Sequence, residues 1–449
     1  MTRGCQPAEN KYLGRYAVIP PQYWPSIGEK WGRIFPEPFL SACVIPVSDE
    51  PTDCLRWILP SLSGERRRLL VFVVNGRASS STEALGRNRD FCEILREGAE
   101  EECLAPTISV LRRREWGAGA VVLINRSTPQ TFFAEHQGVG LARRWGLDLV
   151  YGLWSFGYLA QEYVLSSDAD AELSSARWRA IEEEDSSCSA LLFQWQHYDS
   201  FAAGTEEQKR PRLPLPMVHL EIAFRYYTLG LEFARSPFAF HALGSAFAAS
   251  MEDYAKVRGM PDRQAGEDFH FLAKLSQVRA LKMAMDPVVR ILCRESDRVP
   301  FGTGPRFSEA VASQDLQVES PWCFFALRSC FKHLEERLLA LDLRRPGGEA
   351  SDSGQESERA TCLRPAEDQV LEEGTKACLQ KAENYGREQA AMIWSRRASL
   401  LKGLPSHQHA RRRLYEFFDA LQVRRWLNQA SLHFHSVSVR ELPQFCGQP

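Results

Sequence analysis

Short apolar runs alternate with helix-like segments between Leu40 and Glu183, and this alternation is the strongest constraint on the fold. Strands are predicted at Leu40–Val47, Arg68–Val74 and Tyr163–Ser167, because each run is short, apolar and followed by polar residues. Residues 119–125 form a further β-rich run, and helical patterns cover residues 52–62, 83–103, 138–146 and 174–183. The alternation predicts an α/β fold in which helices flank a mostly parallel sheet.

Polar side chains follow three of these predicted strands. Asp49 and Glu50 come after the first strand, Asn75 after the second, and Asp168 and Asp170 after the third. Ligands of such sheets bind in the crevice beyond the carboxyl ends of the strands. We therefore expect these five side chains to lie near one another, although they are far apart in the sequence.

The overall composition bears on partners and location. A formal net charge of −2, from 55 basic and 57 acidic residues, offers no general attraction to nucleic acid or to an anionic membrane. The sequence has no run of about 18 apolar residues for a membrane span, and it starts without the apolar core of a signal peptide. We therefore expect a cytoplasmic protein whose 12 cysteines, which form no CxxC pair, are reduced thiols.

A change in composition marks a boundary in the C-terminal part. Residues 344–364 are almost free of aliphatic side chains and rich in Gly, Ser and Glu, which is typical of a flexible linker. The expected parts are an N-terminal extension (1–37), an α/β domain (38–310), a helical segment (311–343), a linker (344–365) and a C-terminal helical region (366–449). Expected core residues of the last region include Leu400, Leu401 and Trp426. Three roles stay open for it: covering an active site, recognising an acceptor or forming a homo-oligomer.

The most informative motif is Asp168-Ala169-Asp170, which directly follows an apolar strand. Two carboxylates that point into a crevice suit a hard cation such as Mg²⁺ or Mn²⁺. An isolated DxD tripeptide is more often a solvated turn. Its position after a strand, and the motifs that accompany it, favour a metal site instead.

A second acidic pair, Glu267-Asp268, follows Gly266 and opens a segment in which Phe269, Leu272 and Leu275 fit the buried face of a helix. Two interpretations apply to acids at the start of a helix. They favour the positive end of the helix dipole, which is a common structural role. Alternatively, a carboxylate fixed there accepts a proton from an attacking hydroxyl group.

A third segment, Arg294–Gly304, combines arginines, hydroxyl groups and glycines. Arginine binds phosphate oxygens in a bidentate manner, and glycine lets the backbone approach a ligand closely. Arg294 and Arg298 are therefore candidates for binding a diphosphate. A turn closed by salt bridges is the structural alternative for the same residues.

The order of these motifs resembles one enzyme family. Val44–Pro51 (VIPVSDEP), Gly138–Arg144 (GVGLARR), Ser167–Asp170 (SDAD) and Gly266–Asp268 (GED) follow one another as in inverting glycosyltransferases of family two. Between them, Gly244–Phe247 and Val257–Pro261 are similar to the acceptor-side strand and turn of that family. The resemblance covers residues 38–310 and implies the GT-A fold, which is Rossmann-like.

The resemblance also implies a reaction and a set of site residues. A hexosyltransferase-like enzyme would move a sugar from a nucleotide-diphosphate sugar to an unidentified acceptor hydroxyl, with inversion. Asp168 and Asp170 would hold Mg²⁺ or Mn²⁺, Asp268 would be the catalytic base, and Glu267 would bind the acceptor. The implied donor-binding residues are Pro46, Val47, Asp49, Glu50, Asn75, Arg143, Asp168, Arg294 and Arg298.

Two features depart from the family. Asn75-Gly76 stands where many members carry an Asp, and the separate metal-ligand histidine is not assigned, with His241 and His270 as candidates. A lone His among aromatic residues is more often a packed side chain than a ligand. Two alternatives therefore stay open: a noncatalytic protein that binds sugar nucleotides or carbohydrates, and a nucleotidyltransferase, for which the GED motif has no role.

Overall fold

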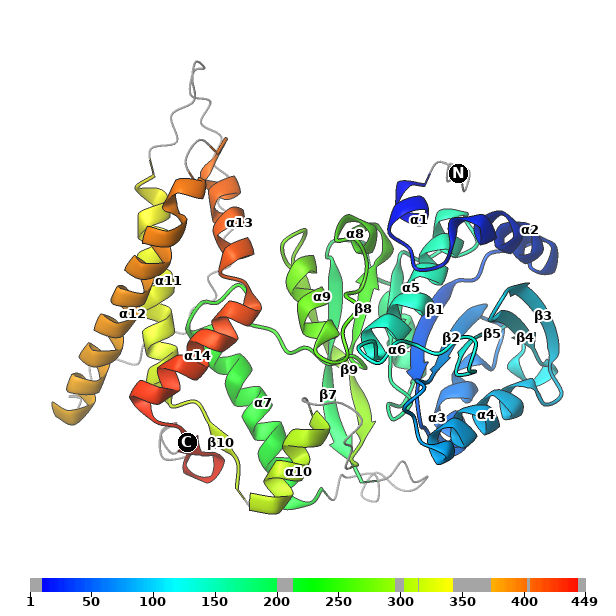
Figure 1. Ribbon diagram of the computed structural model, residues 1–449, viewed down its shortest axis with the longest axis horizontal. Coiled ribbons are helices and arrows are strands. Elements are labelled where there is room, and N and C mark those ends of the chain that lie inside the picture. Colours follow the sequence, from blue (N-terminus) through cyan, green and yellow to red (C-terminus); the bar gives the residue numbers. More distant parts are fainter. Residues whose placement is uncertain are drawn as a thin grey trace. The chain divides into compact units, whose positions relative to one another are not determined.

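A computed structural model describes residues 10–199, 213–294, 303–313, 315–341, 373–401 and 404–442. The chain divides into two compact units, Met1–Ile222 with His241–Leu316 and Ala223–Phe240 with Gln317–Pro449 (Figure 1). Arg298 and the predicted linker at 344–365 lie outside the described residues. The expected domain boundaries stay predictions.

The first unit contains a nine-stranded sheet with the order β3-β4-β5-β2-β1-β6-β8-β7-β9. Its strands are β1 (Ser41–Val47), β2 (Arg68–Asn75), β3 (Glu100–Ala105), β4 (Ile108–Arg112), β5 (Ala120–Arg126), β6 (Tyr163–Ser166), β7 (Ala190–Tyr198), β8 (Phe247–Ser250) and β9 (Leu281–Leu292). Strands β5, β2, β1 and β6 are parallel neighbours, as are β7 and β9, whereas β3, β4 and β8 pair antiparallel. The prediction of an α/β fold with a mostly parallel sheet is confirmed.

The topology predicts a ligand site at the carboxyl ends of β1 and β6, and this edge of the sheet is called the crevice below. From β1 the chain continues into β2 and β5 on one side and then crosses to β6 on the other side of β1. Such a reversal of strand order opens a crevice between the loops that leave the two strands. All residues of β1, β2 and β6 are buried, which is why their sequences are continuously apolar rather than alternating.

Helices flank this sheet. The helices described in the first unit are α1 (Lys11–Arg15), α2 (Trp24–Ile34), α3 (Leu55–Ile58), α4 (Thr82–Arg96), α5 (Val139–Ser155), α6 (Ser175–Glu182), α8 (Met251–Lys256), α9 (Glu267–Leu275) and α10 (Thr303–Ser313), and α7 (Leu215–Phe233) belongs partly to each unit (Figure 1). Helix α5 packs closely on the sheet at Gly146, where an added Cβ would lie 2.3 Å from Val44 Cγ1. This helix therefore brings its N-terminal turns directly to the crevice.

Two predicted helices differ from the structure. The helix expected at 83–103 ends at Arg96, and residues from Glu100 onward form β3. Gly98 has a φ of +68°, a conformation that stops a helix. Residues 52–62 form α3 between two short 3₁₀ turns, Thr52–Cys54 and Leu59–Leu62, because Pro60 cannot continue a regular helix.

Asp148 anchors the N-terminal segment on α5. Its fully buried carboxylate accepts hydrogen bonds from the hydroxyls of Tyr12 (2.6 Å) and Tyr254 (2.5 Å) and from the backbone N–H of Val18 (2.7 Å). A buried carboxylate is tolerated when several donors satisfy it. Tyr12 and Val18, which precede β1, are thus packed against the helix that covers the sheet.

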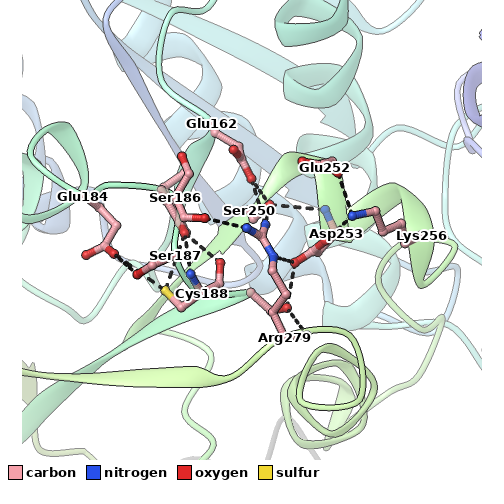
Figure 2. A network of polar contacts seen from close by, with 12 residues as sticks. Glu162, Glu184, Ser186, Ser187, Cys188, Ser250, Glu252, Asp253, Lys256 and Arg279 are labelled. Atoms are coloured by element: carbon pink, nitrogen blue, oxygen red, sulfur yellow. Dashed lines mark hydrogen bonds and ion pairs between the residues drawn. The ribbon is translucent and has the colours of Figure 1, made fainter. Parts of the chain in front are cut away.

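A polar network closes the end of the sheet opposite to the crevice, before β6, β7 and β9 and after β8 (Figure 2). Arg279 donates to Asp253 Oδ2 (2.5 Å) and Glu162 Oε1 (3.2 Å), and Lys256 contacts Asp253 Oδ1 at 2.9 Å. Asp253 also accepts from Ser189 Oγ at 2.7 Å. Because β8 runs antiparallel to β6 and ends at this network, its first residue, Phe247, lies beside Ser166 at the crevice.

The second unit is mainly helical. It contains α11 (Pro321–Leu339), α12 (Glu373–Leu401), α13 (His407–Phe417), α14 (Ala420–Phe434) and the short strands β10 (Gln317–Val318) and β11 (Val437–Ser438). The predicted helical C-terminal region is confirmed. Leu401 and Trp426 are buried as expected, but Leu400 is 47% exposed, because it lies on the opposite face of α12.

Candidate active site

The Asp168-Ala169-Asp170 loop leaves β6 at the crevice, and its backbone is held by neighbouring elements. Ser167 N–H donates to the Val44 carbonyl of β1 at 3.0 Å, and Trp57 Nε1 donates to the Ala169 carbonyl at 3.0 Å. The Asp170 carbonyl accepts the N–H of Leu292, the last residue of β9, at 2.8 Å. The two carboxylates therefore stand on a fixed loop between β1 and β9.

Arg177 of α6 supports this loop from inside the protein. Its fully buried guanidinium donates to the Ser166 carbonyl (3.1 Å), to Ser167 Oγ (3.1 Å) and to the Ser245 carbonyl (2.7 Å). Burial lowers the pKa of Arg177 to about 10, so the side chain keeps its charge at neutral pH. Arg177 thus ties the acidic loop to the turn before β8.

Arg294 joins Asp170 to Glu50. It forms a bidentate pair with Glu50, at 2.6 and 2.7 Å, and donates to Asp170 Oδ2 at 2.8 and 3.1 Å. It reaches both acids because it follows β9 by two residues, next to the Leu292–Asp170 backbone contact. Burial opposes its charge, but Glu50 and Asp170 outweigh burial and raise the pKa of Arg294. This guanidinium thus joins the loops after β1, β6 and β9.

Arg143 of α5 forms a corresponding link on the other side of the loop. Its Nη2 donates to Asp168 Oδ1 at 2.6 Å, and its Nε donates to Glu267 Oε1 at 3.1 Å. Its side chain is only 3% exposed. Burial opposes its charge, but Asp168, Glu267, Asp268 and Asp170 together raise the pKa of Arg143. The DAD and GED motifs therefore belong to one electrostatic cluster.

The GED motif opens α9, as predicted. Gly266 precedes the helix with a φ of +68°, so that Glu267 and Asp268 lie in its first turn. The buried face of α9 uses Phe271 rather than the expected Phe269, which is partly exposed, together with Leu272 and Leu275. The two acids thus stand at the positive end of the helix dipole.

The two acids differ in burial. Burial, and next the charge of Asp268, raises the pKa of Glu267 to about 8, against the opposing effect of Arg143. Asp268 is partly exposed, and its Oδ1 accepts the backbone N–H of Phe269 at 2.7 Å. On accessibility, Asp268 is the member of the pair that can meet a hydroxyl group from solution.

The remaining donor-binding candidates lie at the ends of β1 and β2. Pro46 and Val47 are buried within β1, and Asn75 donates its side-chain amide to the Val47 carbonyl at 3.0 Å. Asp49 has a φ of +59°, accepts a salt bridge from Arg87 at 2.5 Å and is partly exposed. Pro46, Val47 and Asn75 are buried, so Asp49 is the most exposed of the four residues. Contacts between these residues and a donor stay predictions.

Asp168 and Asp170 suit a divalent metal ion that binds together with substrate phosphates. Among the residues that the structure describes, no group of three or more His, Cys, Asp or Glu side chains could form a metal site. Mg²⁺ is usually held by one or two carboxylates together with substrate phosphates and water. Asp168 and Asp170 fit that pattern. His241 offers no clear third ligand, because its Nε2 lies 2.9 Å from the Phe193 carbonyl.

Sequence reasoning did not identify the supporting residues Arg177 and Trp57. Arg177 lies in a segment that also carries Arg179 and Glu182, so nothing in the helical pattern distinguishes it. One signal was available, because Ser166 and Ser167 at the end of a buried strand require hydrogen-bond partners inside the protein.

Comparison with protein-family models and with curated proteins identifies no relative. No protein-family model matches the chain, and no curated protein matches it significantly. Among the described residues, no helix combines the length and apolar composition that crossing a membrane requires.

Proposed function

We propose that this protein is a metal-dependent glycosyltransferase that moves a sugar from a nucleotide-diphosphate sugar to an acceptor hydroxyl group with inversion. The observation that carries the proposal is the Arg143 link between Asp168 and Glu267, which joins the DAD and GED motifs in one crevice. The supporting resemblance to family-two glycosyltransferases assigns these motifs to the two substrates of one reaction. The crevice lies where α/β sheets commonly bind nucleotides.

On the donor side, Asp168 and Asp170 would hold a divalent cation together with the diphosphate. A cation of this kind neutralises the charge that develops on the diphosphate as the bond to the sugar breaks. Arg294 lies beside Asp170 and carries a planar set of donors that fits phosphate oxygens. It is the described arginine best placed to bind the departing diphosphate.

On the acceptor side, Asp268 accepts the proton of the acceptor hydroxyl. The hydroxyl oxygen forms a bond to the anomeric carbon while the bond from that carbon to the diphosphate oxygen breaks on the opposite face. The electron pair leaves with the nucleotide, and the configuration at the carbon inverts. Asp268 suits the role because it is partly exposed and fixed at the start of α9.

Calorimetry with Mn²⁺ and nucleoside diphosphates tests the donor side. UDP, GDP, ADP and dTDP are titrated into the full-length protein with and without Mn²⁺. We expect one of them to bind only with Mn²⁺, and we expect Asp170→Ala to remove this binding. Asp90→Ala is the matched control, since that side chain is 56% exposed on α4. Binding that Asp170→Ala leaves intact would contradict the proposal.

The salt bridges also favour a second candidate, a noncatalytic protein that binds sugar nucleotides. In it, the salt bridges that Arg143 and Arg294 form with Asp168 and Asp170 in this structure would persist when the ligand binds. Hydrolysis and transfer assays with the nucleotide sugar that binds separate the two candidates. Binding without any turnover, across a panel of hydroxyl acceptors, would favour the noncatalytic protein.

A further inference from the structure

We propose that Arg143 is a positioning residue that couples the donor side of the site to the acceptor side, an inference that rests on the glycosyltransferase function proposed above. The family resemblance implies that Arg143 binds the donor. Its side chain is 3% exposed, however, and two of its nitrogens already hold Asp168 and Glu267. Arg143 therefore acts on the donor through Asp168 rather than by contact.

The geometry of the Arg143 guanidinium explains how one residue can fix the relative position of the DAD and GED motifs. Asp168 lies in the loop after β6, and Glu267 lies at the start of α9. Because the guanidinium is planar and its N–H groups have fixed directions, two carboxyl groups bound to Nη2 and Nε are held at a fixed relative position. A movement of either carboxyl group must therefore move the guanidinium or break a hydrogen bond.

Stability does not account for this arrangement. Replacing a buried ion pair by packed apolar side chains is often neutral or stabilising. In addition, Nη1 of Arg143 is buried without a hydrogen-bond partner among the described residues, which is unfavourable. A side chain that is costly to bury and that joins two acidic motifs fits a role in function.

The Arg143 guanidinium is tightly packed against the backbone at Gly244. A Cβ at Gly244 would lie 1.8 Å from Arg143 Nη2. The Gly244 carbonyl accepts a hydrogen bond from Ser166 Oγ at 2.7 Å, so the backbone at Gly244 is held on β6. Because that backbone is held, a methyl group at position 244 would displace the guanidinium from Asp168.

A double-mutant cycle with Gly244→Ala and Arg143→Lys tests the coupling, and the readout is the affinity for Mn²⁺ with the nucleoside diphosphate that binds the wild type. We expect Gly244→Ala to weaken this affinity about 10–100-fold, as is usual when a group that orients a metal ligand is disturbed. Lysine lacks the Nη2 that the new methyl group meets. In the Arg143→Lys background, Gly244→Ala should therefore change the affinity less than threefold or so.

Two further variants complete the experiment. Gly86→Ala on α4 is the matched control, because its added Cβ meets no atom within 4 Å, and its affinity should equal that of the wild type. Glu267→Ala lies on the acceptor side and removes the oxygen that accepts the hydrogen bond from Arg143 Nε. It should weaken the affinity for Mn²⁺ and diphosphate when residue 143 is Arg, but not when it is Lys. This variant also tests the coupling if Gly244→Ala does not fold.

The outcomes separate this inference from the proposed function. If the wild type binds none of the four nucleoside diphosphates with Mn²⁺, the proposed function and the inference both fail. If the wild type binds one of them, but the effects of Gly244→Ala and Arg143→Lys simply add and Glu267→Ala leaves the affinity unchanged, only the inference is overturned.

Discussion

The buried carboxyl group of Glu267 should make the stability of the protein depend on pH, and Glu267→Gln should remove this dependence. In the folded protein, burial and the charge of Asp268 raise its pKa from 4.5 to about 8. Between these two values the folded state keeps a proton that the unfolded state releases. The stabilising contribution is therefore complete below pH 4.5 and is lost as the pH rises toward 8.

The magnitude follows from the linkage of one proton to folding. The free energy of unfolding of the wild type should fall by at most about 1.4 kcal/mol for each pH unit in this range. Glutamine has the shape of the protonated acid but no titration. Between pH 5.5 and 7.5, Glu267→Gln should therefore gain roughly 2–3 kcal/mol relative to the wild type.

Urea unfolding of full-length wild type and variant at several pH values measures this difference. Hydrogen exchange of peptides from β1 and β6 identifies the transition of the unit that contains the sheet. Glu93→Gln is the control, because the Glu93 side chain is 67% exposed on α4, and its free energy of unfolding should differ from that of the wild type by the same amount at every pH. If the difference between Glu267→Gln and the wild type were also independent of pH, the reasoning would be refuted, because Arg143 would then keep Glu267 ionised over the whole range.

Two further predictions concern stability. Asp148→Ala leaves two buried tyrosine hydroxyls without their acceptor and should lower the free energy of unfolding by about 3–5 kcal/mol, measured by urea unfolding. A loss below 1 kcal/mol or so would show that the N-terminal segment is not anchored there. Gly146→Ala should cost about 1–3 kcal/mol, because its Cβ meets Val44 at 2.3 Å. Gly86→Ala should instead be neutral or stabilising, and equal effects of the two would contradict the packing of α5.

The strands around the crevice could be predicted from the sequence, and the physical reason is burial. Strands β1, β2 and β6 are buried along their whole length, so each appears as a continuous apolar run that ends in polar residues. The acids after β1 and β6 followed from the same rule, because parallel strands end at one edge of the sheet. Strand β3 was missed, since Glu100, Glu101 and Glu102 give it no apolar alternation.

The links between the motifs could not be predicted. Arg143 and Glu267 are 124 residues apart in the sequence, and Arg294 and Glu50 are 244 residues apart. No local sequence pattern indicates which residues pair at such separations. The sequence assigned Arg294 to the donor because arginine binds phosphate well, whereas Arg143 was assigned to it by the family resemblance. The structure adds that Arg143 is buried between two carboxylates, a feature that depends on how α5 packs on the sheet.

The last prediction concerns Asp268 as the catalytic base: Asp268→Asn should lower sugar transfer by about 10²–10⁴-fold while donor affinity and thermal stability stay close to those of the wild type. Asparagine keeps a side-chain oxygen that can accept the Phe269 N–H, so the start of α9 should persist, whereas the proton acceptor is lost. Transfer and donor affinity are measured on the same preparation, with the acceptor found in the transfer screen. If Asp268 had only a capping role, activity would survive the change, because asparagine caps helices about as well as aspartate. Transfer within a fewfold of the wild type would therefore exclude Asp268 as the base and leave Glu267, or His270 in the same helix, as the group to test next.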